Sequence, residues 1–486
     1  MRRHCRPLFR LLLNWGRPDQ FYRKVTIGAL PDYVLLEMFN FYVDEGHRAD
    51  IWHTLVHVCR RWRYLVFASP RRLNLQILCT NRRPVREMLD IWPALPIFAI
   101  WDNSDPRSLV DNFLAALDDR ERVCRIDLWQ VGTFVWEICA SAMQGPFPKL
   151  TELTLRLGNQ AAPPFPDSFL GGTGPPLRTL DLDGVHFPAL NKLLLSAKDL
   201  VTLRLWDIPH SGYISPATML TCLFAMTKLE TLQLGLRSRP EEETQRQPSL
   251  AREVLPSLTR LQFKGVSEYL ESLISRIDVP LLDDLTVTFF NQPIFNIPQL
   301  LRLIDRTEKF KELNEAVMIV SRPSAEVTLH EQAGTVSHTG TRLALEILCR
   351  ESEHLSSLAQ ACTTSLSPLS TLERLEILDY RRRYPLGGVE NAQWLAILQP
   401  FTAVKDLYVS EGLVSLALRD IDGERVAEVL PALQNLYLRE PPRFGPVQIS
   451  VERFVTARKR SGHPVTFYRR DIDDASDKAN ANHYAF

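Results

Sequence analysis

Closely spaced cysteines are lacking in this sequence. The eight cysteines are scattered over 486 residues, and the nearest two, Cys349 and Cys362, are thirteen positions apart. No CxxC pair is therefore available to bind zinc or to form a redox couple. Isolated cysteines in a chain of this size are typical of small buried side chains in a reducing compartment. We therefore expect the protein to be cytoplasmic or nuclear.

Long apolar runs and net charge are lacking as well. No apolar stretch approaches the roughly 20 residues that are needed to cross a bilayer, and 57 Lys and Arg balance 57 Asp and Glu. This balance disfavours a nucleic-acid reader or a membrane-bound protein. Residues 1–25 carry only one acid, Asp19, and we interpret them as a basic extension, with a mitochondrial presequence as the alternative. Residues 471–486 have the composition of a disordered tail.

Catalytic and metal-binding motifs are also lacking. The chain has no G-x-S-x-G nucleophile elbow, no G-x-x-x-x-G-K-[ST] phosphate loop and no G-x-G-x-x-G. His53 and His57 have the i,i+4 spacing of two metal ligands on a helix, but no Glu follows His53 and no third ligand is evident. We therefore predict no enzymatic activity, no cofactor and no metal. An enzyme with an unrecognised site is the alternative.

The first organised segment spans residues 26–75. It opens with Leu30-Pro31-Asp32, and a proline suits the first turn of a helix. Apolar residues then recur at helical spacing on both sides of a polar stretch, Asp44 to Asp50. Two or three short amphipathic helices carry more apolar surface than they can bury among themselves. The segment therefore predicts a partner or a covering domain.

The following segment, residues 76–470, contains a repeat. The strand pattern L-x-x-L-x-L, with occasional Val, Ile or Phe, recurs at 150–155, 177–182, 200–205, 229–234, 258–263, 282–287, 372–377, 404–409 and 433–438. Neighbouring clear copies start about 23 to 32 residues apart, close to the spacing of leucine-rich repeats. Helical patterns lie between the strands, and this alternation predicts a parallel sheet with helices behind it. We therefore expect an α/β solenoid: a leucine-rich-repeat-like horseshoe with parallel strands and outer helices. The pattern predicts no repeat register between 301 and 370.

The helical segment resembles an F-box. That family has a Leu-Pro start, a helix with paired aliphatic residues and a Phe, and then a helix that ends in Val-Cys-x-x-Trp. The matching residues here are Leu30, Pro31, Leu35, Leu36, Phe39, Val58, Cys59 and Trp62. The whole chain is most similar to F-box-like proteins of mushroom-forming fungi, in which the box leads into an R-R-L-N-L segment, here residues 71–75.

The resemblance implies a short all-α F-box that docks on a Skp-family adaptor and, through it, on a cullin–RING ubiquitin ligase. The repeat array would then present a protein substrate. The residues that would form or support the adaptor contact are Leu30, Pro31, Leu35, Leu36, Phe39, Val58 and Trp62. The chain departs from the family in its longer Asp44–Asp50 loop, and Val185, Ile208 and Val266 replace the usual Asn or Cys after the strand. The alternative is a scaffold whose box-like helices only cap the array.

The strand pattern also predicts which face binds a substrate. The leucines of each strand point into the core, so the residue between the last two leucines and the residue after them point outward. The predicted substrate-binding residues are Arg204, Trp206, Tyr408, Arg419, Tyr437 and Arg439. The last four are aromatic and basic, which favours an acidic or phosphorylated partner. The alternative is that these side chains only keep the strand surface soluble.

Overall fold

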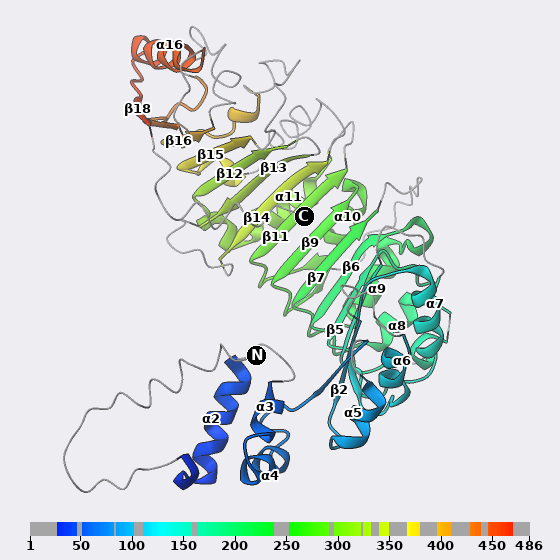
Figure 1. The fold of residues 1–486 in the computed structure, drawn as a ribbon. Coiled ribbons are helices and arrows are strands. Elements are labelled where there is room, and N and C mark those ends of the chain that lie inside the picture. The colour runs from blue at the N-terminus through cyan, green and yellow to red at the C-terminus, as the bar shows by residue number, and fades with distance from the viewer. Residues whose placement is uncertain are drawn as a thin grey trace, which may run out of the picture. The chain divides into compact units, whose positions relative to one another are not determined.

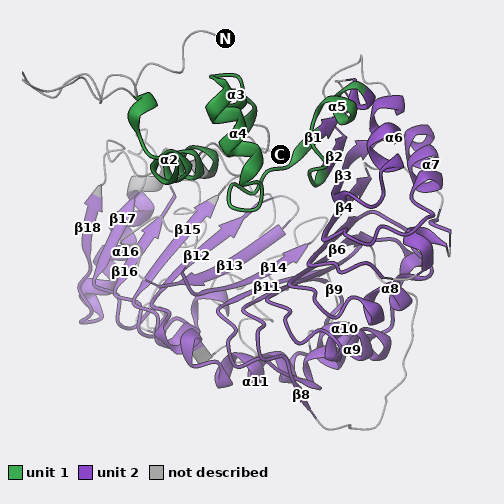
Figure 2. Ribbon diagram, turned by 90° about the horizontal axis from the view of Figure 1, so that it is seen from below, with its two compact units in different colours: residues 1–78, 87–97 green, residues 79–86, 98–486 purple. Residues whose placement is uncertain are grey.

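The structure is a computed structural model. It describes residues 27–45, 51–81, 84–101, 110–157, 164–166, 168–172, 174–237, 252–290, 296–321, 324–331, 340–348, 367–379, 396–410, 428–438 and 446–469. The expected basic extension and the expected tail lie outside these residues. The chain divides into two compact units (Figure 2): unit 1 comprises residues 1–78 and 87–97, and unit 2 comprises residues 79–86 and 98–486.

Unit 1 is helical (Figure 1). Its elements are η1 (Ile27–Ala29), α2 (Asp32–Glu45), α3 (Trp52–Val56) and α4 (Arg60–Ala68). Helix α2 begins directly after Pro31, whose carbonyl accepts hydrogen bonds from the amides of Val34 and Leu35 at 3.1 Å. The helix continues through Asp44 and Glu45, where a polar loop was expected; the rest of the expected loop, residues 46–50, lies outside the described residues. Helical hydrogen bonding of the backbone overrides the polar composition there.

The core of unit 1 joins its three helices and a later segment of the chain. Leu35 and Phe39 of α2 are buried, and the ring of Phe39 lies 4.7 Å from that of Trp62 in α4. Trp52 of α3 is buried against Trp92, with ring centroids 5.3 Å apart. The sequence placed residues 87–97 in the array, but they lie within unit 1. This aromatic contact accounts for the difference.

Most strands of the described chain form one sheet of sixteen, in the order β1-β2-β3-β4-β5-β6-β7-β9-β11-β14-β13-β12-β15-β16-β17-β18. The strands of this sheet are β1 (Ile77–Thr80), β2 (Ile97–Trp101), β3 (Val123–Val131), β4 (Glu152–Leu157), β5 (Thr179–Asp183), β6 (Thr202–Ile208), β7 (Thr231–Leu236), β9 (Arg260–Gly265), β11 (Asp284–Phe290), β12 (Glu315–Val320), β13 (Ser324–His330), β14 (Arg342–Leu348), β15 (Arg374–Asp379), β16 (Asp406–Val409), β17 (Asn435–Leu438) and β18 (Thr466–Arg469). Strands β1 and β2 lie at the boundary of the two units. Each of the nine leucine patterns coincides with a strand, and most neighbouring strands are parallel. The predicted α/β architecture with a largely parallel sheet is therefore confirmed.

Helices α6 to α11 lie along one face of the sheet (Figures 1 and 2). The remaining elements are α5 (Val85–Ile91), α6 (Val110–Asp118), α7 (Thr133–Ala142), α8 (Leu190–Ser196), α9 (Pro216–Phe224), α10 (Ser267–Ile274), α11 (Pro298–Arg306), α16 (Pro446–Arg460), η2 (Phe169–Gly172), η3 (His210–Gly212), η4 (Glu308–Glu312), η5 (Ser367–Ser370) and the two-stranded sheet of β8 (Glu253–Val254) and β10 (Ile277–Asp278). Leucines such as Leu203 and Leu205 are buried, while the alternating residues are more exposed. Across the described part of the chain, no helix is long and apolar enough to span a membrane.

The sheet is interrupted by an antiparallel hairpin that the sequence did not predict. Strand β13 is antiparallel to both β12 and β14, and β11 pairs with β14 rather than with β12. Only residues 321–323 connect β12 to β13, and the amide of Ser321 donates to the carbonyl of Ser324 at 2.9 Å. A connection this short can only join antiparallel strands, because a parallel crossover needs a dozen or more residues. The hairpin thus occupies part of the 301–370 region that lacked a predicted register.

Candidate interaction surfaces

The Leu30-Pro31 turn lies at the start of α2 in unit 1. Pro31 is exposed, and the side chain of Val58 is 57% exposed. Leu30, Leu36 and Trp62 are half-buried. The other two predicted adaptor residues, Leu35 and Phe39, are buried in the core of unit 1. They can support a contact surface, whereas the exposed and half-buried residues are available to form one.

Arg61 fixes this turn, and sequence reasoning missed it. Its guanidinium donates at 2.6 Å to the carbonyls of both Gly28 and Leu30, and its Nε donates at 3.0 Å to the Asp32 carboxylate. One side chain of α4 therefore holds the backbone within η1 and directly after it, together with the first residue of α2. Arg61 occupies a variable position of Val-Cys-x-x-Trp, so the motif gave no signal for its role.

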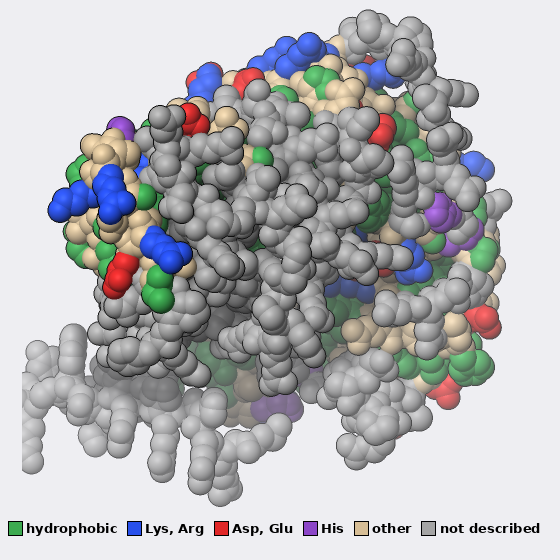
Figure 3. Space-filling model, turned by 90° about the horizontal axis from the view of Figure 1, so that it is seen from above, with side chains coloured by type: hydrophobic (Ala, Val, Ile, Leu, Met, Phe, Trp, Pro, Cys, Tyr) green, Lys and Arg blue, Asp and Glu red, His purple; other side chains and the backbone are tan. Residues whose placement is uncertain are grey.

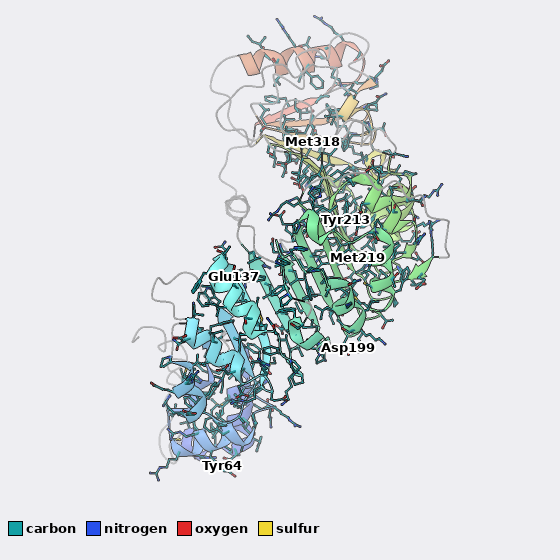
Figure 4. All side chains as sticks on the ribbon, turned by 90° about the vertical axis from the view of Figure 1, so that its right-hand side faces the viewer. Tyr64, Glu137, Asp199, Tyr213, Met219 and Met318 are labelled. Atoms are coloured by element: carbon teal, nitrogen blue, oxygen red, sulfur yellow. The ribbon has the colours of Figure 1, made fainter. Side chains whose placement is uncertain are left out.

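Unit 1 exposes further large apolar side chains. Tyr64 of α4, labelled in Figure 4, is 72% exposed. The other exposed members in unit 1 are Ile27, Tyr33, Met38, Phe41, Val58 and Ile91. Tyr64 also lines a shallow pocket of about 400 Å³ on α4 with Arg60, Arg63, Phe67 and Ala68. Exposed apolar side chains in this number are typical of an interaction surface.

The two histidines of the metal hypothesis contact aromatic rings. The ring of His53 stacks on Trp92 at 4.9 Å and meets Trp52 edge-on at 4.0 Å, and His57 lies 6.2 Å from Trp92. Within the described ranges, no group of three or more His, Cys, Asp and Glu residues could hold a metal ion. Aromatic packing therefore accounts for the positions of both histidines.

The side of the sheet in unit 2 that faces away from α6 to α11 forms what we call the polar face. It consists of the strand residues that alternate with the buried apolar ones, such as Thr154, Asp181, Arg204, Gln262 and Thr286. The register of the paired strands places these five residues in one row across the sheet. Charged side chains of both signs are visible on the molecular surface in Figure 3, in keeping with the balanced composition.

Arginines and aspartates pair at the β4–β6 end of the polar face. Asp181 is buried, and both of its carboxylate oxygens are hydrogen-bonded. Arg156 donates to Oδ2 at 2.5 Å and Arg204 donates to Oδ1 at 2.9 Å. Arg204 also donates to Asp183 at 3.1 Å. Burial raises the pKa of Asp183 above its ordinary value, against the opposing effect of Arg204. Arg204, a predicted substrate residue, is therefore engaged by two carboxylates of its own chain.

Trp206 follows in the same strand, and its indole lies against the backbone of Gly235. A Cβ added at Gly235 would be 2.7 Å from the indole ring, closer than real Cβ atoms come to other heavy atoms. The next residue, Asp207, has a φ of 52° at a register shift between Leu205 and Ile208. Such bulges reorient the neighbouring side chain. The ammonium of Lys264 lies 5.8 Å from the centre of the Trp206 ring.

A pocket of about 500 Å³ lies on the polar face beside Trp206. Residues of six strands, β6, β7, β9, β11, β13 and β14, line it. Its charged residues are Arg260, Lys264, Asp284, Glu326, Arg342 and Glu346. Sequence reasoning predicted Trp206 as a binding residue but missed the residues of β13 and β14. The alternation of small apolar and polar residues in 324–330 was the signal that could have found β13.

Two glutamates lie directly opposite each other in this pocket. Glu326 of β13 is the register partner of Glu346 of β14. Glu326 accepts from the hydroxyl of Thr328 at 2.7 Å and from Arg342 at 3.5 Å, whereas Glu346 accepts from the hydroxyl of Thr288 at 3.0 Å. Burial raises the pKa of Glu326, and the charge of Glu346 raises it further. Arg342 thus contacts Glu326 at the limit of hydrogen-bonding distance.

Three tyrosines stack on the polar face near its C-terminal end. The ring of Tyr437 lies 4.4 Å from Tyr408 at 8° and 4.9 Å from Tyr468 at 14°. Sequence reasoning predicted Tyr408 and Tyr437 but missed Tyr468. The other two predicted residues of this end, Arg419 and Arg439, lie outside the described residues. Seven strands separate β16 from β6 in the sheet, so the predicted substrate residues belong to two separate places and not to one site.

No protein-family model matches this chain, and no curated protein sequence matches it either. Its function therefore has to be inferred from the residues themselves.

Proposed function

We propose that this protein is the substrate-recognition adaptor of a cullin–RING ubiquitin ligase. In this proposal unit 1 is an F-box that docks on a Skp-family adaptor, and unit 2 is a leucine-rich-repeat-like array that holds a protein substrate. One observation carries the proposal. The Leu30-Pro31 turn and Val58 are exposed or half-exposed at the surface of a compact helical unit, and they are the residues by which the segment resembles an F-box.

The burial of the motif residues supports a division of roles. Pro31 and Val58 contact the adaptor, with Leu30, Leu36 and Trp62 at the margin of the contact, and the buried Leu35 and Phe39 hold α2 in place. Arg61 positions the turn through the carbonyls of Gly28 and Leu30. The exposed apolar residues of unit 1 support the same proposal, because exposed apolar surface is costly unless a partner covers it.

The regular succession of strands in unit 2 supports the second half of the proposal. From β3 to β7 each strand pairs in parallel with the next strand of the chain, as stacked repeats would. The polar face then offers a long row of outward side chains to a protein. In this proposal the chain performs no chemistry itself and works in a reducing compartment, the cytoplasm or the nucleus.

Co-purification tests the proposal. A tagged chain is expressed together with a Skp-family adaptor, and wild type is compared with the double variant Leu30→Ala/Pro31→Ala. We expect stoichiometric capture by the wild type and loss of capture by the double variant. Phe134→Ala, which removes an exposed apolar side chain from α7 of unit 2, should capture the adaptor normally. Circular dichroism melting would show that both variants remain folded.

One observation favours the rival function of a leucine-rich-repeat scaffold that is not linked to a ligase. Trp52 packs against Trp92, so the helical unit includes the segment between β1 and β2. A terminal cap of an array would be built in this way. If neither wild type nor variant captures the adaptor, the ligase proposal is wrong and the scaffold is favoured.

A further inference from the structure

Most charged residues that line the pocket on the polar face form ion pairs, and among the described residues Glu346 is in none of them. Arg260 donates to Asp284 at 3.0 Å, and Arg342 lies 3.5 Å from Glu326. Lys264 pairs at 3.4 Å with Asp207, outside the lining. Glu346 has only the hydroxyl of Thr288 as a partner among the described residues. Glu346 is therefore the carboxylate of this pocket that a cation from a partner can pair with.

The position of the two glutamates supports the same conclusion. Like charges directly opposite each other on neighbouring strands destabilise a sheet. Glu326 and Glu346 occupy such a pair, and Glu326 is half-buried. A protonated amine or guanidinium between them would relieve the repulsion and donate to both carboxylates, as charge-assisted hydrogen bonds do. The strand register therefore creates a carboxylate pair that a basic side chain fits.

The other end of the pocket is aromatic. Trp206 lines it, and the contact with Gly235 fixes the orientation of the indole. Four strand steps separate β6 from β14, through β7, β9 and β11. At about 4.8 Å per step this is roughly 19 Å. An extended peptide covers that length with about five to six residues.

We propose that this pocket binds an extended segment of a protein partner that carries a Lys or Arg between Glu326 and Glu346 and an apolar side chain against Trp206. The inference deepens the proposed function, because it names the chemistry of the segment that the array would hold. It differs from the acidic or phosphorylated partner that the sequence suggested for the C-terminal end. The two surfaces are separate on the sheet, and the mixed charges of the pocket distinguish it from the tyrosine stack.

Fluorescence anisotropy with capped, labelled peptides tests the inference on the purified full chain. Each peptide carries one Lys and one Phe, in either order, separated by two to eight Ser residues. A matched series replaces Lys by norleucine, which keeps the length but lacks the charge. We expect the tightest binding at four or five intervening residues and at least about ten-fold weaker binding of the norleucine peptides.

Two variants assign the effect to the pocket. Glu346→Gln should abolish the preference for Lys over norleucine, while Glu152→Gln, the same change on β4 of the polar face, should preserve it. Equal binding of both peptide series, absence of binding, or an unchanged preference in Glu346→Gln would each overturn the inference. No Skp-family adaptor is present in this assay, so its failure is distinguishable from failure of the ligase proposal, which depends on unit 1.

Discussion

Gly235→Ala should destabilise unit 2 because the added methyl group would collide with Trp206. The Cβ would lie 2.7 Å from one ring atom and 2.8 Å from another, so the indole has to move. Overpacking of this kind costs about 1–3 kcal/mol. Replacing Gly by Ala inside a strand returns about 0.5–1 kcal/mol through the lower entropy of the unfolded chain. The net loss in the free energy of unfolding should therefore be up to about 2 kcal/mol.

A double-mutant cycle isolates the collision. In a Trp206→Ala background the methyl group meets no indole, so Gly235→Ala should be neutral or stabilising by up to about 1 kcal/mol. The coupling between the two positions should then be about 1–3 kcal/mol in denaturant unfolding. Gly340→Ala is the matched control, because a Cβ there has no neighbour within 4 Å. Equal costs of Gly235→Ala with and without Trp206 would refute the packing of the indole on the glycine.

Three further predictions concern other parts of the chain. Arg61→Met should weaken capture of a Skp-family adaptor by up to roughly thirty-fold in titrations while unit 1 stays helical, because the turn loses two backbone hydrogen bonds of about 1 kcal/mol each; undiminished capture would contradict the role of Arg61. Glu326→Gln should stabilise the chain at pH 7 by about 0.5–1 kcal/mol in thermal unfolding. The pKa of Glu326 is raised in the folded state, so the stability that protonated Glu326 contributes is present below its unfolded pKa and is lost as the pH rises through its folded pKa. The gain from Glu326→Gln should therefore disappear at pH 3, and a gain that persists there would argue against repulsion from Glu346. Finally, a thiol reagent should modify exposed Cys59 in the native state and spare Cys79, whose pKa burial raises to about 12; mass spectrometry of the labelled peptides would decide.

Local patterns in the sequence predicted most strands of the sheet, because burial on one face imposes an alternation that is visible within six residues. The leucines at 203 and 205 and the outward position of Trp206 follow from it directly. The start of α2 was predicted from an equally local signal, because a proline suits the beginning of a helix and α2 begins directly after Pro31. The exposure of Val58 did not follow in the same way, because both a core position and a surface position fit its place in the helical pattern.

Tertiary structure alone decided which residues meet. Glu326 and Glu346 are twenty positions apart, and only the antiparallel pairing of β13 with β14 brings them opposite each other. Gly235 and Trp206 lie on neighbouring strands whose register shifts at a bulge. Strand register depends on long-range hydrogen bonding and packing rather than on residue spacing. The sequence by itself therefore determined the strands and the direction of their side chains, whereas the folded chain determined the pocket that those side chains form.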